Sequence, residues 1–311
     1  MTALHIEKWI TGVSPEDRTS AVARRALESR LAAVRHYLPL AAEEPDEGGE
    51  HVHELRVFTR RTTALLKLFA DLLPARKARQ MRKRVKQIRG AANDARDLDV
   101  LTQRWQKPRP DARLSQVLDD IRTRREGAQQ LLQATCERVN RDDRFERRST
   151  KLLRRLHPRG NDTYGGKDSR YEDWARSNLR QLLDQFFAAS PASAQDVKSL
   201  HQFRIRAKEL RYAMEVLAGA FPPAFRDQLY PVVETLQDKL GEINDYASGR
   251  AHFRRRIKLA EDAEECAHLQ KLSRTESARF ERARHSFLKW WLPRRRDNLF
   301  ARFNALLGPD E

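Results

Sequence analysis

The chain has 311 residues, of which 34% are charged and 40% belong to the hydrophobic set, a balance that excludes a disordered or low-complexity chain. No run approaches 18 apolar residues, and the N-terminus lacks the basic-then-apolar layout of a signal peptide, so we expect neither a membrane span nor secretion. The formal net charge of +17 predicts a polyanionic partner, and arginine, whose planar fork matches phosphate oxygens, outnumbers lysine 47 to 14.

Helical periodicity dominates the first half of the chain. Ser14 as N-cap, followed by Pro15, predicts that the first helix begins at residue 15 and continues through YLPL. The acidic, glycine-bearing segment AAEEPDEGGE ends this helix. Further helices are predicted over residues 51–73, 76–104, 112–140 and 142–157.

A turn-rich stretch, HPRGNDTYGGKDSR, divides the chain near its middle. We take residues 158–170 as a linker between a first half, 1–157, and a second half, 171–311. The helices that follow are predicted at 168–189, 195–219, 224–247 and 249–283, with a short C-terminal piece. Alternating strand patterns are missing, so the fold class is all-α with antiparallel bundles.

An internal repeat relates the two halves. A shift of 148 residues brings histidine onto histidine, base onto base and aspartate onto aspartate, with the same separation of 44 residues from the histidine to the aspartate in both halves. We therefore predict two pseudo-symmetric antiparallel four-helix bundles around a pseudo-twofold axis. The matched pairs are His53 with His201, Arg56 with Arg204, Arg60 with Lys208, and Asp97 with Asp245.

Basic side chains form rows at helical spacing, opposite apolar faces. Two such rows on adjacent antiparallel helices predict a groove for a string of phosphates. A phosphate polymer has no bases, so it needs cations but none of the aromatic platforms on which nucleic-acid bases stack. The rows are His53, Arg56, Arg60 and Lys67 in the first half; Arg79, Arg82, Lys86, Arg89 and Arg96 on the next helix; and His201, Arg204, Lys208 and Arg211 in the second half.

Two longer motifs resemble a known family. HELRVFTRRTTALLKLFADLLP with ARDLDVL, and LHQFRIRAKELRYAMEVL with LQDKLGEINDYA, resemble the two halves of the CHAD family, the α-helical domain named after its histidines, over about residues 15–290. The resemblance implies two four-helix bundles around a basic central cavity that binds inorganic polyphosphate, and an association with polyphosphate granules. The predicted polyphosphate-binding residues are the three rows above together with Arg61.

The family often carries a triphosphatase domain of the CYTH type, whose Glu-x-Glu-x-Lys motif does not occur near this N-terminus. We therefore expect a stand-alone, non-catalytic binding module without cofactor. Cys136 and Cys266 stand alone, which is typical of a reducing cytoplasm. The cytoplasm, with or without polyphosphate granules, is thus the expected location.

The repeat is imperfect where charge matters. Thr63 stands where the second half has Arg211. The second-half counterpart of the 79–96 row is not basic, which predicts that the first half contributes more to binding. That counterpart reads Asp227, Tyr230, Glu234, Gln237 and Asn244.

Alternative readings stay open at this point. A basic helical protein could bind RNA or single-stranded DNA, and a polyphosphatase ranks last because no carboxylate cluster suited to Mg²⁺ lies on a basic row. His53 and His201, each taken alone, fit a structural role. Asp97 and Asp245 are expected to anchor basic side chains rather than to touch a polyanion. The HVH stretch at 51–53 lacks further ligands at matching spacing, so no metal site is expected.

Overall fold

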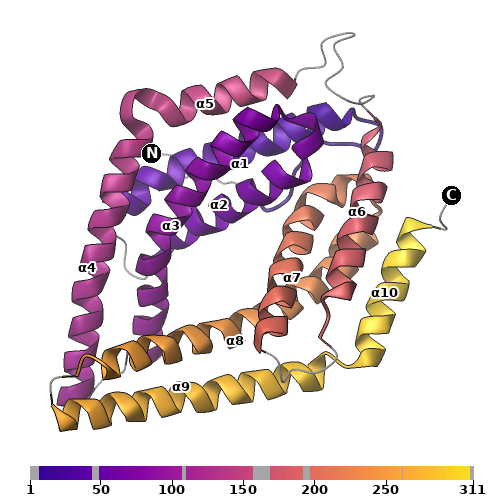
Figure 1. Ribbon diagram of the computed structural model, residues 1–311. Coiled ribbons are helices and arrows are strands. Elements are labelled where there is room, and N and C mark those ends of the chain that lie inside the picture. The colour runs from indigo at the N-terminus through magenta and orange to yellow at the C-terminus, as the bar shows by residue number, and fades with distance from the viewer. Residues whose placement is uncertain are drawn as a thin grey trace. The chain divides into compact units, whose positions relative to one another are not determined.

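The computed structural model describes residues 7–43, 49–106, 110–156, 169–191, 197–260 and 262–308, and their regular structure is helical (Figure 1). The expected all-α class is confirmed. The chain divides into two compact units. Unit 1 comprises Met1–Gln106, Leu118–Asn178 and Glu215–Ala220, and unit 2 comprises Lys107–Val117, Leu179–Met214 and Phe221–Glu311. The predicted linker falls almost entirely outside the described residues.

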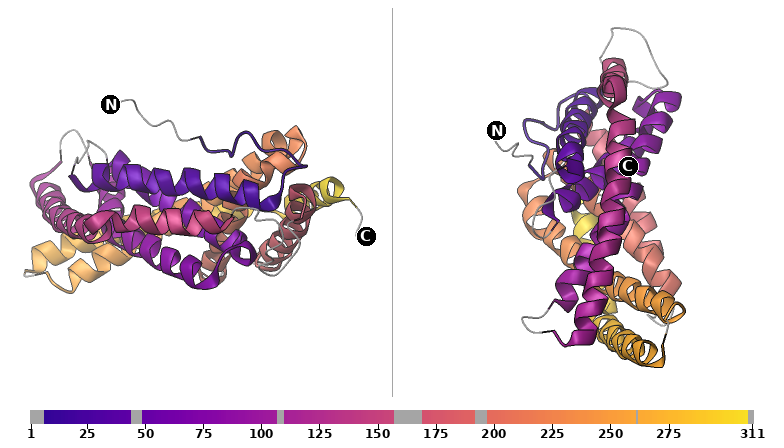
Figure 2. Two further views of the ribbon diagram at one scale, coloured as in Figure 1. Left: turned by 90° about the horizontal axis from the view of Figure 1, so that it is seen from above. Right: turned by 90° about the vertical axis from the view of Figure 1, so that its left-hand side faces the viewer.

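Unit 1 is built around α2, which packs on both α1 and α3, while α5 lies along α1 (Figures 1 and 2). The apolar sides of α2 and α3, including Leu55, Phe58, Val85 and Ile88, are fully buried in one core. The elements are α1 (Thr19–Glu43), α2 (Glu50–Leu68), η1 (Ala70–Leu72), α3 (Ala75–Trp105), α4 (Ala112–Asn140), η2 (Arg141–Asp143), α5 (Arg144–Leu153), η3 (Arg154–Leu156) and the start of α6 (Tyr171–Ala188).

The first helix begins later than Ser14 and Pro15 predict. Ser14 donates its N–H to the Asp17 carboxylate at 2.9 Å and so opens a turn instead of capping a helix. The backbone that follows pairs with the segment before α6: the Thr19 N–H donates to the Ser169 carbonyl at 3.1 Å, and the Tyr171 N–H to the Asp17 carbonyl at 2.8 Å. These partners are remote in sequence. The local signals at Ser14 and Pro15 therefore could not reveal that this backbone pairing competes with the start of the helix.

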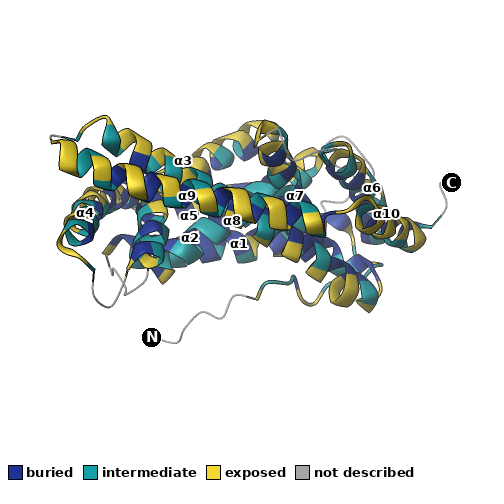
Figure 3. Ribbon diagram, turned by 90° about the horizontal axis from the view of Figure 1, so that it is seen from below, coloured by how far each residue is buried: buried dark blue, intermediate teal, exposed yellow. Residues whose placement is uncertain are grey.

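Unit 2 contains a long hairpin of α8 and α9, which pack along each other, and its core is rich in aromatic rings such as Phe186, Phe203 and Phe287. The outer side of α9 carries exposed residues (Figure 3). Helix α7 (Val197–Leu217) begins in unit 2, but its last turn and η4 (Ala218–Ala220) belong to unit 1. The other elements of unit 2 are η5 (Phe225–Leu229), α8 (Tyr230–Ile257), α9 (Ala263–Trp290) and α10 (Pro293–Leu307).

The predicted break between helices at residue 248 is wrong. Helix α8 continues through this point to Ile257, with Gly249 buried in its interior. The break comes instead before Asp262, whose carboxylate caps α9 by accepting the Glu265 N–H at 2.6 Å. An Asp with acids in the following turn is a strong helix start, and here it decides where the hairpin turns.

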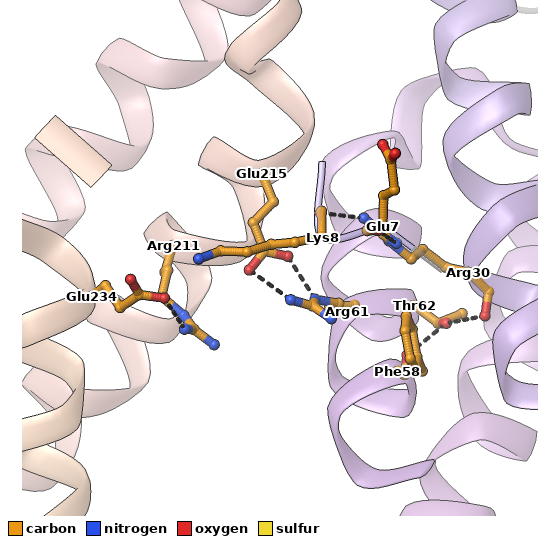
Figure 4. Close-up of polar contacts among 9 residues, drawn as sticks. All are labelled: Glu7, Lys8, Arg30, Phe58, Arg61, Thr62, Arg211, Glu215 and Glu234. Atoms are coloured by element: carbon orange, nitrogen blue, oxygen red, sulfur yellow. Dashed lines mark hydrogen bonds and ion pairs between the residues drawn. The ribbon is translucent and has the colours of Figure 1, made fainter. Parts of the chain in front are cut away.

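A buried ion pair joins α2 to the last turn of α7 inside unit 1 (Figure 4). Arg61 donates from Nε to Glu215 Oε2 at 2.7 Å and from Nη2 to Oε1 at 3.1 Å. The side chains are only 12% and 1% exposed. Such a pair is costly to break, since the remaining charge stays buried without its partner.

Replacing Glu215 by alanine should therefore destabilise the protein by about 3–5 kcal/mol, because Arg61 loses its buried carboxylate. Urea unfolding followed by helicity measures this. The matched control is Asp119→Ala, since the Asp119–Arg122 pair is 66% and 71% exposed and such pairs contribute at most about 1 kcal/mol. Equal losses in the two variants would contradict the importance of the buried pair.

Candidate basic binding site

Arg56 sets the register of α2 against α3. Its Nη1 donates to the Asn93 carbonyl at 2.9 Å and to Asp97 Oδ1 at 2.9 Å. The two helices are joined by a short turn and run antiparallel (Figure 1), so a step up α2 from Arg56 corresponds to a step back along α3 from Asn93. At 1.5 Å per residue in both helices, Arg60 lies level with Arg89. The basic rows of α2 and α3 thus run side by side.

The basic rows of α2 and α3 together form what we call the double row. Basic groups cluster at one end of it. Burial lowers the pKa of the His53 imidazole, and the positive charges of Arg96, Arg60 and Arg56 lower it further, against the opposite effect of Glu50. Burial also lowers the pKa of Arg56, with Arg60 and Arg96 acting in the same direction and Asp97 against it. Four basic groups from two helices therefore lie close enough to repel one another, and an anion placed there relieves this repulsion.

The rest of the double row is more open to solvent. Arg79 and Lys86 are exposed, and Arg60 and Arg82 are half-buried. Within the described part of the chain, these four side chains have neither an ion pair nor a side-chain hydrogen bond. Lys67 is exposed and Arg89 half-buried on the same faces. The double row therefore presents uncompensated positive charge.

Arg61, which the resemblance adds to the binding residues, lies differently from its neighbour Arg60. The structure directs it to Glu215, and its guanidinium lies 5.3 Å from the centre of the Phe58 ring (Figure 4). Next to it, the buried Arg30 donates to the backbone carbonyls of Glu7 at 2.6 Å and Lys8 at 2.5 Å. Burial, together with the charge of Arg61, lowers the pKa of Arg30 to about 10. Sequence spacing could not find this pair, because Glu215 lies 154 residues from Arg61.

The basic row of α7 in unit 2 is partly neutralised. His201 is exposed, and Arg204 and Lys208 are half-buried. Arg211 donates to Glu234 Oε1 of α8 at 3.3 Å (Figure 4), and its guanidinium lies 5.1 Å from the centre of the Tyr212 ring.

The repeat explains the difference between the halves. The first-half positions that correspond to Arg211 and Glu234 are Thr63 and Lys86. Thr63 donates its hydroxyl to the Thr59 carbonyl of its own helix, so an ion pair in unit 2 is replaced by an uncompensated lysine in unit 1.

The two aspartates of the repeat lie on α3 and α8. Asp97 accepts from Arg56 while its own side chain stays 58% exposed, and Asp245 is half-buried on α8. The hydrogen bond from Arg56 links Asp97 of α3 to α2. Among the described residues, no group of three or more His, Cys, Asp or Glu side chains is disposed to hold a metal ion, and no helix there is long and apolar enough to cross a membrane.

Comparison with known proteins agrees with this architecture. A family model described as the CHAD domain matches residues 25–254. The structure is similar to the crystal structure of the CHAD domain from the plant Ricinus communis, with 20% sequence identity, 96% of each chain covered and a TM-score of 0.70. It is also similar to PptA from Streptomyces chartreusis, with 18% identity, 88% of this chain and 99% of that chain covered, and a TM-score of 0.63. No curated protein matches this chain.

The charge cluster makes a prediction that needs no ligand. Replacing Arg96 by glutamine should raise the pKa of His53, because one of the positive charges that disfavour the imidazolium is removed. An NMR titration of the His53 ring measures the shift. Arg79→Gln is the control, since Arg79 lies about 25 Å farther along the same helix and should leave the titration unchanged. An unaltered pKa in the Arg96 variant would show that the charge of Arg96 does not act on His53.

Proposed function

This chain belongs to the CHAD domain family, and we propose that it binds inorganic polyphosphate along the basic rows of α2 and α3, with the row of α7 as a further contributor. The observation that carries the proposal is the set of uncompensated cations on two adjacent antiparallel helices. These cations are Arg60, Arg79, Arg82 and Lys86.

The chemistry of the double row suits a polymer of phosphates without bases. Each phosphate unit carries a negative charge that an arginine fork or a lysine can contact. The residues that make up the two rows include no aromatic side chain, whereas proteins that bind single-stranded nucleic acids stack the bases on aromatic rings. This favours polyphosphate over RNA or single-stranded DNA.

Binding without catalysis fits the carboxylates beside the rows. Asp97 accepts a hydrogen bond from Arg56, and Glu234 accepts one from Arg211. Each acid is thus engaged by an arginine of its own unit and orients that cation. We propose a cytoplasmic location, with the association with polyphosphate granules that the family resemblance implies.

Neutralising three of the uncompensated cations should weaken polyphosphate binding on the order of a hundredfold, at roughly 1 kcal/mol for each lost charge contact. The variant is Arg60→Gln, Arg82→Gln and Lys86→Gln, and the measurement is fluorescence polarisation with labelled long-chain polyphosphate at fixed ionic strength. Competition with RNA of equal total charge, at the same salt concentration, is measured on the wild type.

The matched control removes two arginines and one lysine from exposed positions at the end of α8. It is Arg254→Gln, Arg255→Gln and Lys258→Gln, and it should keep affinity within a few-fold of the wild type. Equal losses in both triple variants would mean that only net charge matters. RNA that competes as well as polyphosphate would contradict the proposed partner.

Polyphosphate affinity should depend on pH through His53. In the free protein, burial and the charges of Arg96, Arg60 and Arg56 lower the pKa of His53, and a nearby polyanion raises this pKa. Binding then takes up a proton, so affinity should be flat at high pH, rise as the pH falls through the pKa of His53 in the complex, and become flat again below the pKa of His53 in the free protein. Measurements from pH 8 to pH 5.5 on wild type, His53→Gln and His201→Gln test this. A slope that persists unchanged in His53→Gln would assign the histidine a structural role alone.

A further inference from the structure

Helix α9 carries a second row of cations, outside the motifs that define the repeat. Five residues of this helix fall within a sector of about 80° at 100° per residue and extend over about 27 Å. All five are exposed, and within the described residues none has an ion pair or a side-chain hydrogen bond. The side of α9 that carries exposed residues is visible in Figure 3. The basic row of α9 consists of Lys271, Arg274, Arg282, His285 and Lys289.

The acids of α9 do not neutralise this row, because each is bound to another arginine. Glu276 is buried and pairs with Arg279 at 3.1 Å, one turn along the helix. Glu281 pairs with Arg284 at 2.9 Å. The acids of the first turn are engaged by arginines outside α9: Glu264 pairs with Arg113, and Glu265 with Arg256 at 3.3 Å.

A solvated face required by the fold would recur in both halves, and this one does not. The 148-residue shift places the row of α9 on Thr123, Glu126, Ala134, Glu137 and Arg141. Two of these five are acids, and both acids are exposed on α4. The second half, whose α8 lacks the basic row of α3, therefore carries its extra cations on α9.

Neighbouring helices add charge at the C-terminal end of the row. Lys239 of α8 and Arg295 of α10 lie 5.7 Å and 4.5 Å from the centre of the Trp290 ring. Trp290 directly follows Lys289, so cations from three helices of unit 2 gather there. A hollow of about 610 Å³ borders this part of α9, and its lining is Glu281, Arg282, Arg284, His285, Ser286, Leu288 and Lys289.

We propose that the basic row of α9 is a second binding site for a linear phosphate polymer, which holds a stretch of inorganic polyphosphate independently of α2 and α3. This inference rests on the proposed function. The cations lie along one helix, which suits an extended chain, and Arg282, His285 and Lys289 among them line the hollow. The indole of Trp290 is engaged by Lys239 and Arg295, so the ring serves to position cations and not to stack a base, which favours a polymer without bases.

The test counts short polyphosphate chains, about ten units long, bound per protein at saturation by isothermal titration calorimetry. The variant Arg274→Gln, Arg282→Gln and Lys289→Gln should bind one chain fewer than the wild type. The charge-matched control Arg254→Gln, Arg255→Gln and Lys258→Gln should bind as many chains as the wild type. All six positions carry an arginine or lysine at the surface of unit 2, and equal helicity and urea midpoints establish that the variants fold.

The outcomes separate this inference from the proposed function. An α9 variant with an unchanged number of chains, alongside weakened binding in the Arg60, Arg82 and Lys86 variant, overturns the α9 site and leaves the proposed function intact. A wild type that binds no polyphosphate overturns both. Loss of binding to phosphatidylserine vesicles in the α9 variant, with polyphosphate binding unchanged, would assign the row to a membrane surface and overturn the proposal. The α9 site is supported if the α9 variant binds one chain fewer and if this loss adds to the weakened binding of the Arg60, Arg82 and Lys86 variant when the two are combined.

Discussion

The two hydrogen bonds that Arg56 makes to α3 are the contact on which the candidate site depends. The apolar side chains of α2 and α3 already interdigitate in one core, and the guanidinium of Arg56 adds a directional contact that fits a single register. By binding the Asn93 carbonyl and Asp97 together, Arg56 holds the two basic rows level. Arg56, itself a member of the α2 row, thus aligns the other members of the two rows. Asp97 makes this possible by accepting one of its hydrogen bonds.

Such concentration of like charge is tolerated because the opposite faces of the same helices are buried. Burial of one large apolar side chain contributes about 1.5–3 kcal/mol, whereas repulsion between neighbouring cations on a helix costs about 0.2–0.5 kcal/mol for each pair. Several buried residues from α2 and α3, such as Phe58 and Ile88, therefore outweigh the repulsion along the rows. The folded state can therefore tolerate cations that have no acidic partner. The repulsion among these cations then favours the binding of an anion, which relieves it.

The arginines of the protein divide into two groups by their surroundings. Arg30, Arg56 and Arg61 have little contact with solvent and use their forked donors on backbone carbonyls or carboxylates. Arg60, Arg82 and Arg282 keep their charge uncompensated within the described residues. Adjacent positions can fall in opposite groups, as Arg60 and Arg61 do, because one helical step of 100° turns a side chain from one neighbour to another. Arginine content alone is therefore a poor guide to the binding surface.

The sequence by itself determined the helical class, the internal repeat, the family and the two basic rows of the first half, since each of these follows from local periodicity or from spacing along the chain. Only the tertiary structure decided that α1 begins at Thr19 and that α8 runs to Ile257. It also decided that Arg61 is bound by Glu215 and that the cations of α9 stand apart from its acids. These features depend on which groups meet in space. A backbone donor, a carboxylate or an arginine takes the partner that tertiary packing brings within hydrogen-bond reach, and that partner can lie 150 residues away.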